Sequence, residues 1–210
     1  MKSKGQNRNT FQNSKLFYKR NPSSEWEEIV LSNVQNIFNR VRAITEDGNG
    51  NVWIITSHQG AFVLKPGSGN VIRLVNNPLQ SHTIASDNLT AICSDKDGIV
   101  WLGTFKKGIS YFSPHAQVIL SHHMIPHSDV ISFYEDKEDV WLGTDGGGLL
   151  KLQSDNSVVK VPLEANVIQT IKTDSKGCLW LGTFQNGLFK YQNGRVEHFT
   201  ISNSELASNI

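Results

Sequence analysis

The sequence lacks three features that would fix its class at once: an excess of charge of one sign, a long apolar segment and a set of paired cysteines. Its 210 residues carry 20 Lys and Arg against 19 Asp and Glu. This balance argues against a dedicated nucleic-acid-binding protein, which normally shows a basic excess or stripe. No apolar stretch approaches the roughly 18 residues that a membrane helix requires, so we expect no membrane segment in this chain.

The two cysteines, Cys93 and Cys178, are too few for a disulfide framework. We expect both to be small buried or half-buried thiols without redox or metal chemistry. The chain starts with a polar, basic segment that has no apolar core, and no signal peptide is visible. What the sequence does contain is 17 Gly, 10 Phe and 5 Trp, which predict tight turns with bulky packing between them.

Four of the five tryptophans recur at spacings of 48, 40 and 39 residues, and they are Trp53, Trp101, Trp141 and Trp180. Self-similarity at this period indicates an array of supersecondary units. Three units contain the tetrapeptide Trp-Leu-Gly-Thr, whose glycines are Gly103, Gly143 and Gly182. A glycine at this place leaves room for a neighbouring side chain. Ile55 replaces it in the first unit, so the packing there must differ.

An aspartate precedes each of these tryptophans. Asp47, Asp95 and Asp174 stand six positions before Trp, whereas Asp136 stands five before it because its turn is one residue shorter. We interpret these residues as turn-forming aspartates. Calcium loops need more oxygen ligands than these turns supply.

Each unit divides into four short strands. In the second unit the first two are Leu89 to Cys93 and Val100 to Thr104, and the fourth strands of the four units are Val71 to Leu74, Gln117 to Leu120, Val158 to Val161 and Arg195 to Phe199. No stretch shows sustained helical periodicity. Four strands per repeat of about 40 residues predict an all-β fold of the β-propeller type.

The pattern (I/V)xxxxDxxGxxWLGTxxxG(L/I)xxY resembles the two-component regulator propeller repeat over about residues 41–200. The connector from Asn77-Pro78 to Leu89 is similar to the linker of that family. The resemblance implies an extracytoplasmic or periplasmic sensor propeller, joined in the full-length receptor to a histidine kinase or another output domain. It also implies a small-molecule ligand, with an oligosaccharide as the candidate, because many such sensors respond to carbohydrate breakdown products.

The resemblance predicts how the chain is organised. We expect a disordered polar N-terminus over 1–14, the last two strands of a partial blade over 15–40, and the truncated start of a further blade over 204–210. Four full blades lie between them, over 41–88, 89–129, 130–166 and 167–203. We predict an open arc rather than a closed ring, with blade edges through which copies can associate, and we interpret the chain as part of a longer sensor.

A ligand-facing surface can be nominated from the loops between the second and third strands, which line one face of a propeller. The candidates are His58, Gln59, Phe105, Lys106, Lys107, Asp145, Phe184, Gln185 and Asn186. Aromatic, amide and charged groups in a ring of loops suit sugar or peptide binding. The alternative is that these are ordinary polar loops whose Phe rings pack locally.

No residue set predicts a cofactor, a metal site or a catalytic centre. The histidines at 115, 122, 123 and 127 match no zinc spacing, and Gly146 to Gly148 precede a strand rather than the helix of a phosphate loop. We therefore predict a non-catalytic sensor. A protein-interaction scaffold is one alternative. A propeller lyase or glycosidase is the other, and it would need carboxylates such as Asp87, Asp129 and Asp145 to pair.

Overall fold

The computed structural model describes residues 16–19, 23, 25–29, 40–65, 70–122, 129–136, 139–153, 155 and 157–208. Within these ranges every regular element is a strand and none is a helix. Consequently, no helix in the described part of the chain has the length and apolarity to cross a membrane. The all-β prediction is confirmed.

Sixteen of the strands form four antiparallel four-stranded sheets, each in sequence order. The first sheet contains β3 (Val41–Glu46), β4 (Val52–Thr56), β5 (Ala61–Leu64) and β6 (Val71–Leu74). The second contains β7 (Leu89–Ser94), β8 (Val100–Thr104), β9 (Ile109–Ser113) and β10 (Val118–His122). The third contains β11 (Asp129–Asp136), β12 (Asp139–Asp145), β13 (Leu149–Leu152) and β14 (Val158–Lys160), and the fourth contains β15 (Ile168–Thr173), β16 (Leu179–Thr183), β17 (Leu188–Gln192) and β18 (Arg195–Phe199).

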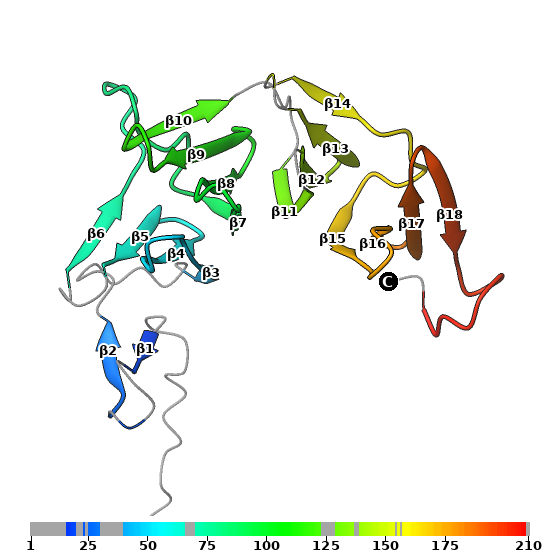
Figure 1. Cartoon of the computed structure of the whole chain (residues 1–210), viewed down its shortest axis with the longest axis horizontal. Helices are drawn as coiled ribbons and strands as arrows, with labels where there is room; N and C mark the ends of the chain where they lie inside the picture. Colours follow the sequence, from blue (N-terminus) through cyan, green and yellow to red (C-terminus); the bar gives the residue numbers. More distant parts are fainter. Residues whose placement is uncertain are drawn as a thin grey trace, which may run out of the picture.

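The sheets stand side by side as an open arc (Figure 1). Their first strands, β3, β7, β11 and β15, lie on the concave side, and these inner strands contact one another from sheet to sheet. Their fourth strands lie on the convex side. The predicted propeller arc, without closure into a ring, is therefore the observed architecture.

The two ends of the chain are simpler. β1 (Leu16–Tyr18) and β2 (Glu27–Ile29) pair antiparallel as a separate two-stranded sheet. Residues 200–208 form turns and bends without a strand. The predicted disordered segment 1–14 and the last two residues, 209 and 210, lie outside the described ranges. The predicted boundaries of the four blades stay predictions.

Three apolar layers between neighbouring sheets form the core, and a repeat tryptophan lies in each. Trp53 packs with Leu89 and Leu102 of the second sheet, and its ring lies 5.3 Å from that of Phe112. Trp101 packs with Val130 and Leu142 of the third sheet. Trp141 packs with the fourth sheet and lies 5.5 Å from the Tyr191 ring. These three tryptophans are only 2–6% exposed, so each sheet buries its tryptophan against the next.

The fourth sheet presents the equivalent face without a covering sheet in the described chain. Trp180 and Leu188 are half-buried there, whereas Leu149, the counterpart of Leu188 in the third sheet, is fully buried. Trp180 instead contacts its own sheet, with its ring stacked at 5.6 Å on Phe199 and with the Lys190 ammonium 5.7 Å from the ring centroid. The arc thus ends on a partly apolar face.

Two of the repeat glycines, Gly103 and Gly143, lie where the main chain of the next sheet approaches closely. A Cβ on Gly103 would stand 2.5 Å from the Val130 carbonyl oxygen of the third sheet. The Thr90 hydroxyl donates to this same carbonyl. In the next layer the Ser132 hydroxyl, beside Gly143, donates to the Ile168 carbonyl at 3.0 Å. The missing Cβ therefore admits a hydroxyl–carbonyl bond between sheets, which refines the prediction that the glycine makes room for a side chain.

The first sheet uses a different contact at this position. Ile55 stands where the other sheets have glycine, and it is fully buried in the apolar layer that includes Leu89 and Val100 of the second sheet. Apolar burial thus replaces the hydroxyl–carbonyl bond. The packing differs there, as the substitution predicts.

The turn aspartates tie each first hairpin to its tryptophan. The Trp53 indole N–H donates to Asp47 Oδ2 at 2.8 Å, and main-chain N–H groups of Asn49 and Asn51 donate to Asp47 Oδ1. The same arrangement recurs at Asp95 and Asp174, whose Oδ2 atoms accept the indole N–H groups of Trp101 and Trp180. Turn formation is thus only one part of the role of these residues, because they also satisfy an indole N–H.

The third sheet departs from this arrangement because its turn is one residue shorter. Asp136 and Asp139 pair as opposite strand residues, so the first hairpin extends by one pair. The buried Trp141 Nε1 finds no hydrogen-bond partner in the described chain. The Lys151 ammonium lies 5.4 Å from the Trp141 ring centroid and pairs with Asp139 at 2.6 Å.

Replacing Asp47 with Ala should lower the free energy of unfolding by about 1–3 kcal/mol, because the buried Trp53 N–H and two turn N–H groups lose their acceptor. Denaturant unfolding measures this loss. Asp155→Ala is the matched control, since Asp155 also accepts a turn N–H, from Ser157, but is exposed. Equal losses in the two variants would contradict the role assigned to the Asp–Trp contact.

Acid should weaken the fold through the same aspartates. The Trp180 indole and the Cys178 N–H lower the pKa of Asp174 to about 2. Burial raises the pKa of Asp47, but hydrogen bonds from Asn51 and Trp53 outweigh it, and the net shift is downward. Because the folded pKa lies below the unfolded value of about 3.9, this stability is complete above about pH 5 and is lost as the pH falls toward 2.

Thermal melting between pH 5 and pH 2 measures this dependence. The double variant Asp47→Asn/Asp174→Asn should show a shallower fall in melting temperature than the unchanged chain. Parallel curves for the two proteins would contradict the assignment.

The two cysteines are as predicted, with Cys178 buried and Cys93 half-buried, both as free thiols. Burial, with the negative charges of Asp95 and Glu135, raises the pKa of Cys93 to about 12. The thiolate is the reactive form of cysteine, so this thiol is protonated and unreactive at neutral pH.

Candidate functional site

Four short loops with the same hydrogen-bond pattern lie at the same end of the four sheets. Each connects the second and third strands of its sheet. In each, a buried threonine hydroxyl donates to the carbonyl of the glycine that ends the loop, at 2.7–2.9 Å. These glycines have φ values of 72–80°, which favour glycine, and they are Gly60, Gly108, Gly148 and Gly187. The loops are therefore fixed turns that hold their tips in defined positions.

The loops also rest on the segments that lead into the inner strands. The Phe105 N–H donates to the Asn88 carbonyl at 2.9 Å, and the Phe184 N–H donates to the Val167 carbonyl at 3.2 Å, so these two loops contact the segment before the inner strand of their own sheet. Gly146 and Gly148 of the third sheet instead donate to the Asn166 carbonyl, which lies before the inner strand β15 of the fourth sheet. Loops and connectors thus form one surface, which we call the loop face.

The structure exposes eight of the nine predicted ligand-facing residues on the loop face. Phe105 and Phe184 are 42% and 46% exposed, a large fraction for aromatic rings. The other six exposed residues are His58, Lys106, Lys107, Asp145, Gln185 and Asn186. Gln59 is the exception: it is only 5% exposed, and its buried Oε1 has no hydrogen-bond partner in the described chain. Its prediction as a surface residue needs this correction.

Local contacts position several of these side chains. The Lys106 ammonium lies 4.9 Å from the Phe105 ring centroid, and Lys106 and Gln185 both adopt a positive φ, of 54° and 66°. The Asn186 carbonyl contacts His198 Nε2 at 2.6 Å, and the His198 ring stacks on Phe189 at 4.0 Å. The two exposed Phe rings belong to the second and fourth sheets, with the third sheet between them.

Two of the three aspartates considered for catalysis do meet. Asp129 and Asp145 are opposite residues of β11 and β12, and Asp129 Oδ1 accepts the Lys106 N–H at 2.7 Å. Burial, with the charge of Asp145, raises the pKa of Asp129 against the opposing effect of Lys106. Asp87 lies apart in the connector after the first sheet, where it accepts the Asn76 N–H. The three do not form one constellation.

No group of three or more His, Cys, Asp or Glu side chains suited to a metal ion occurs among the described residues. His115 is exposed, and His123 and His127 lie outside the described ranges. The side chain of His122 is likewise outside the description. The described loop face presents exposed aromatic rings, amides and charged groups on fixed turns.

A family model described as "Two component regulator propeller" matches residues 37–58, 83–106 and 162–185. In these three segments the chain is similar to the two-component regulator propeller repeat. The matched segments contain Trp53, Trp101 and Trp180, the three tryptophans with an aspartate partner, whereas the unit with the shortened turn is not among them.

Solved structures share the fold of these propeller repeats. One is described as the extracellular domain of a one-component system from B. thetaiotaomicron. It is 22% identical in sequence and has a TM-score of 0.69, and the match covers 88% of this chain and 25% of that one. Another, described as the extracellular domain of a hybrid two-component system from the same organism, is 21% identical with a TM-score of 0.69, over 86% and 25%. The chain thus spans about a quarter of the length of these two structures.

A virginiamycin B lyase from Staphylococcus aureus has the same kind of fold, with 18% identity and a TM-score of 0.64 over 80% of this chain and 58% of that one. At such identities the likeness shows the fold alone. No curated protein matches the chain.

Proposed function

We propose that this chain is the ligand-sensing portion of an extracytoplasmic two-component receptor and that the loop face is its ligand-binding surface. The observation that carries the proposal is the combination of two-component regulator propeller repeats with two exposed Phe rings at equivalent loop positions. Amide and charged side chains flank these rings on fixed turns. Such a surface suits an oligosaccharide, whose C–H faces pack on aromatic rings while its hydroxyls bond to polar groups.

In this proposal the chain is non-catalytic, and an output domain in another part of the receptor carries the signal. A ligand that contacts loops of several sheets favours one relative placement of these sheets over another. Binding then shifts the population of receptor states, and the output domain responds to that shift.

Calorimetric titration with neutral malto-, cello- and xylo-oligosaccharides tests the proposal. We expect saturable binding by one of these series, and a tenfold weaker affinity in Phe105→Ala or Phe184→Ala, which corresponds to about 1.4 kcal/mol of lost contact. Phe17→Ala is the control, because Phe17 is a similarly exposed ring on β1, away from the loop face. Equal loss in the control, or phosphorylation of the isolated chain by ATP, would contradict the proposal.

A further inference from the structure

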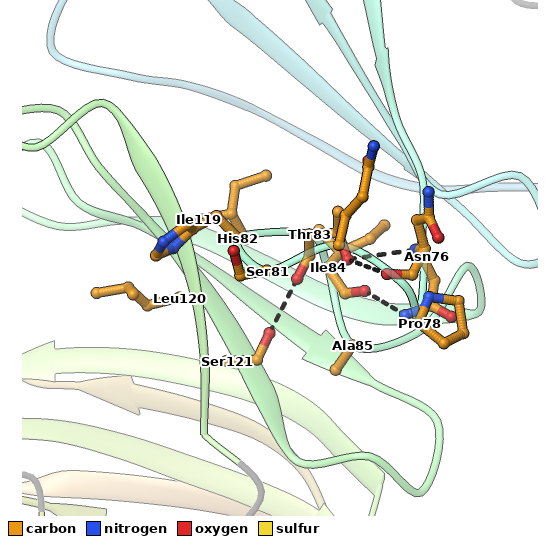
Figure 2. A pocket seen from close by; sticks show the side chains of 12 residues that line it. Asn76, Pro78, Ser81, His82, Thr83, Ile84, Ala85, Ile119, Leu120 and Ser121 are labelled. Carbon is orange, nitrogen blue, oxygen red and sulfur yellow. Dashed lines mark hydrogen bonds between the residues drawn. The ribbon is translucent and has the colours of Figure 1, made fainter.

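A groove of 380 Å³ lies between the connector over residues 75–88 and strand β10 (Figure 2). This connector leads from the outer strand of the first sheet to the inner strand of the second, and it is about twice as long as the connector over 161–167. The volume falls within the range of about 300–1,000 Å³ that is usual for small-molecule sites. The groove is separate from the four loop tips.

The lining of the groove contains no Asp, Glu, Lys or Arg. Amide, hydroxyl and imidazole side chains contribute hydrogen-bonding groups, and they come from Asn76, Asn77, Gln80, Ser81, His82, Thr83 and Ser121. Aliphatic groups supply the rest of the wall, and they come from Pro78, Ile84, Ala85, Ile119 and Leu120. Figure 2 shows His82 of the connector together with Ile119 and Leu120 of β10 among the side chains that line the groove.

Hydrogen bonds hold the walls of the groove in place. The Asn76 amide donates to the Ile84 carbonyl at 2.7 Å, and the Asn77 N–H donates to the Thr83 hydroxyl at 3.2 Å. The Ser121 hydroxyl of β10 donates to the Thr83 carbonyl at 3.2 Å, which joins the connector to the second sheet. A wall fixed before binding loses little conformational entropy when a ligand arrives.

We infer that this groove binds an uncharged, hydroxyl-rich small molecule of the size of a neutral disaccharide. A charged ligand would lose hydration there without gaining a counter-charge from the lining, and this loss is costly. The side chains of Asn76, Thr83 and Ser121 already bond within the wall. The groups offered to a ligand are therefore above all the Gln80 amide and the Ser81 hydroxyl. Amides and hydroxyls both donate and accept, so these two groups match ligand hydroxyls in either role. The inference rests on the proposed sensing function and adds to it a site that contacts two sheets at once. A ligand there stabilises one placement of the first sheet relative to the second.

Amide chemical shifts of the ¹⁵N-labelled chain, titrated with maltose, cellobiose and lactose, test the inference, with digalacturonic acid as the charged comparison. At least one neutral disaccharide should perturb residues 76–85 and 119–121 saturably, and more than tenfold more tightly than the acidic one. Ser81→Trp, which places a large ring on the exposed lining, should weaken this binding at least tenfold. Ser175→Trp, at an exposed turn of the fourth sheet, should leave it unchanged.

Two results would overturn the inference. One is unaltered disaccharide binding in Ser81→Trp. The other is the absence of binding by all three neutral disaccharides. In either case the proposed function still stands if longer oligosaccharides bind and lose affinity in Phe105→Ala or Phe184→Ala, so the two failures can be told apart.

Discussion

Replacing Gly143 with Ala is expected to lower the free energy of unfolding by about 3 kcal/mol, at the upper end of the usual cost of overpacking. The new Cβ would stand 2.6 Å from the Ile168 carbonyl oxygen of the fourth sheet and would also collide with the Ser132 hydroxyl. The carbonyl is main chain and cannot turn aside. The Ser132–Ile168 hydrogen bond between the sheets would be lost with the displacement.

Urea unfolding followed by circular dichroism measures this loss, and Gly48→Ala is its matched control. Gly48 also has a negative φ, and its added Cβ would meet nothing closer than the Gly98 Cα at 3.9 Å. The control should change stability by less than about 0.5 kcal/mol. A Gly143→Ala protein as stable as the control would show that the sheets do not approach as closely as described.

Trp101→Ala is expected to cost about 3–5 kcal/mol, as large-to-small changes of buried aromatic residues usually do. The residue lies in the layer between the second and third sheets and is 6% exposed. Trp180→Ala at the equivalent position should cost about 2 kcal/mol less, because the Trp180 side chain packs only on its own sheet and is half-buried.

Denaturant unfolding of the Trp101→Ala and Trp180→Ala variants measures both losses of stability at equivalent positions of two sheets. Both tryptophans donate to a turn aspartate, so this contribution cancels between the variants. Equal destabilisation would mean that the Trp180 face is covered in solution. Association of copies through that face would produce such a result, and a dependence on protein concentration would reveal it.

Much of the fold could be predicted because the same pattern of Trp, Asp and strand residues recurs in each repeat. The Trp spacing gives the length of the unit, and four short strands per unit indicate a propeller blade. The aspartate before each Trp marks the turn. The sequence also shows that the third unit has a shorter turn at Asp136. This unit contains Trp141, the repeat tryptophan whose indole N–H lacks a hydrogen-bond partner in the described chain.

The site was less predictable because it depends on contacts between units. Gln59 occupies the same loop position as the exposed Lys107 and Asn186, but it is buried where the first loop meets the following connector, with Gly60 donating to the Asp87 carbonyl. The groove along residues 76–85 arises from a connector folding back on β10, and only the length of that connector could have suggested it. The bonds from Thr90 and Ser132 to the next sheet likewise depend on register between sheets.

Four equivalent sheets stack in an open arc, and the last face of this arc has no covering sheet in the described chain. Hydroxyl-radical footprinting with mass spectrometry tests it most directly, because it measures the reactivity of all the tryptophans in one sample. Trp26, at 65% exposure, serves as the internal standard for an exposed ring. We expect the fastest oxidation at Trp26, an intermediate rate at Trp180 and strong protection of Trp53, Trp101 and Trp141. Protection of Trp180 equal to that of the other three in a dilute monomeric sample would contradict the open arc.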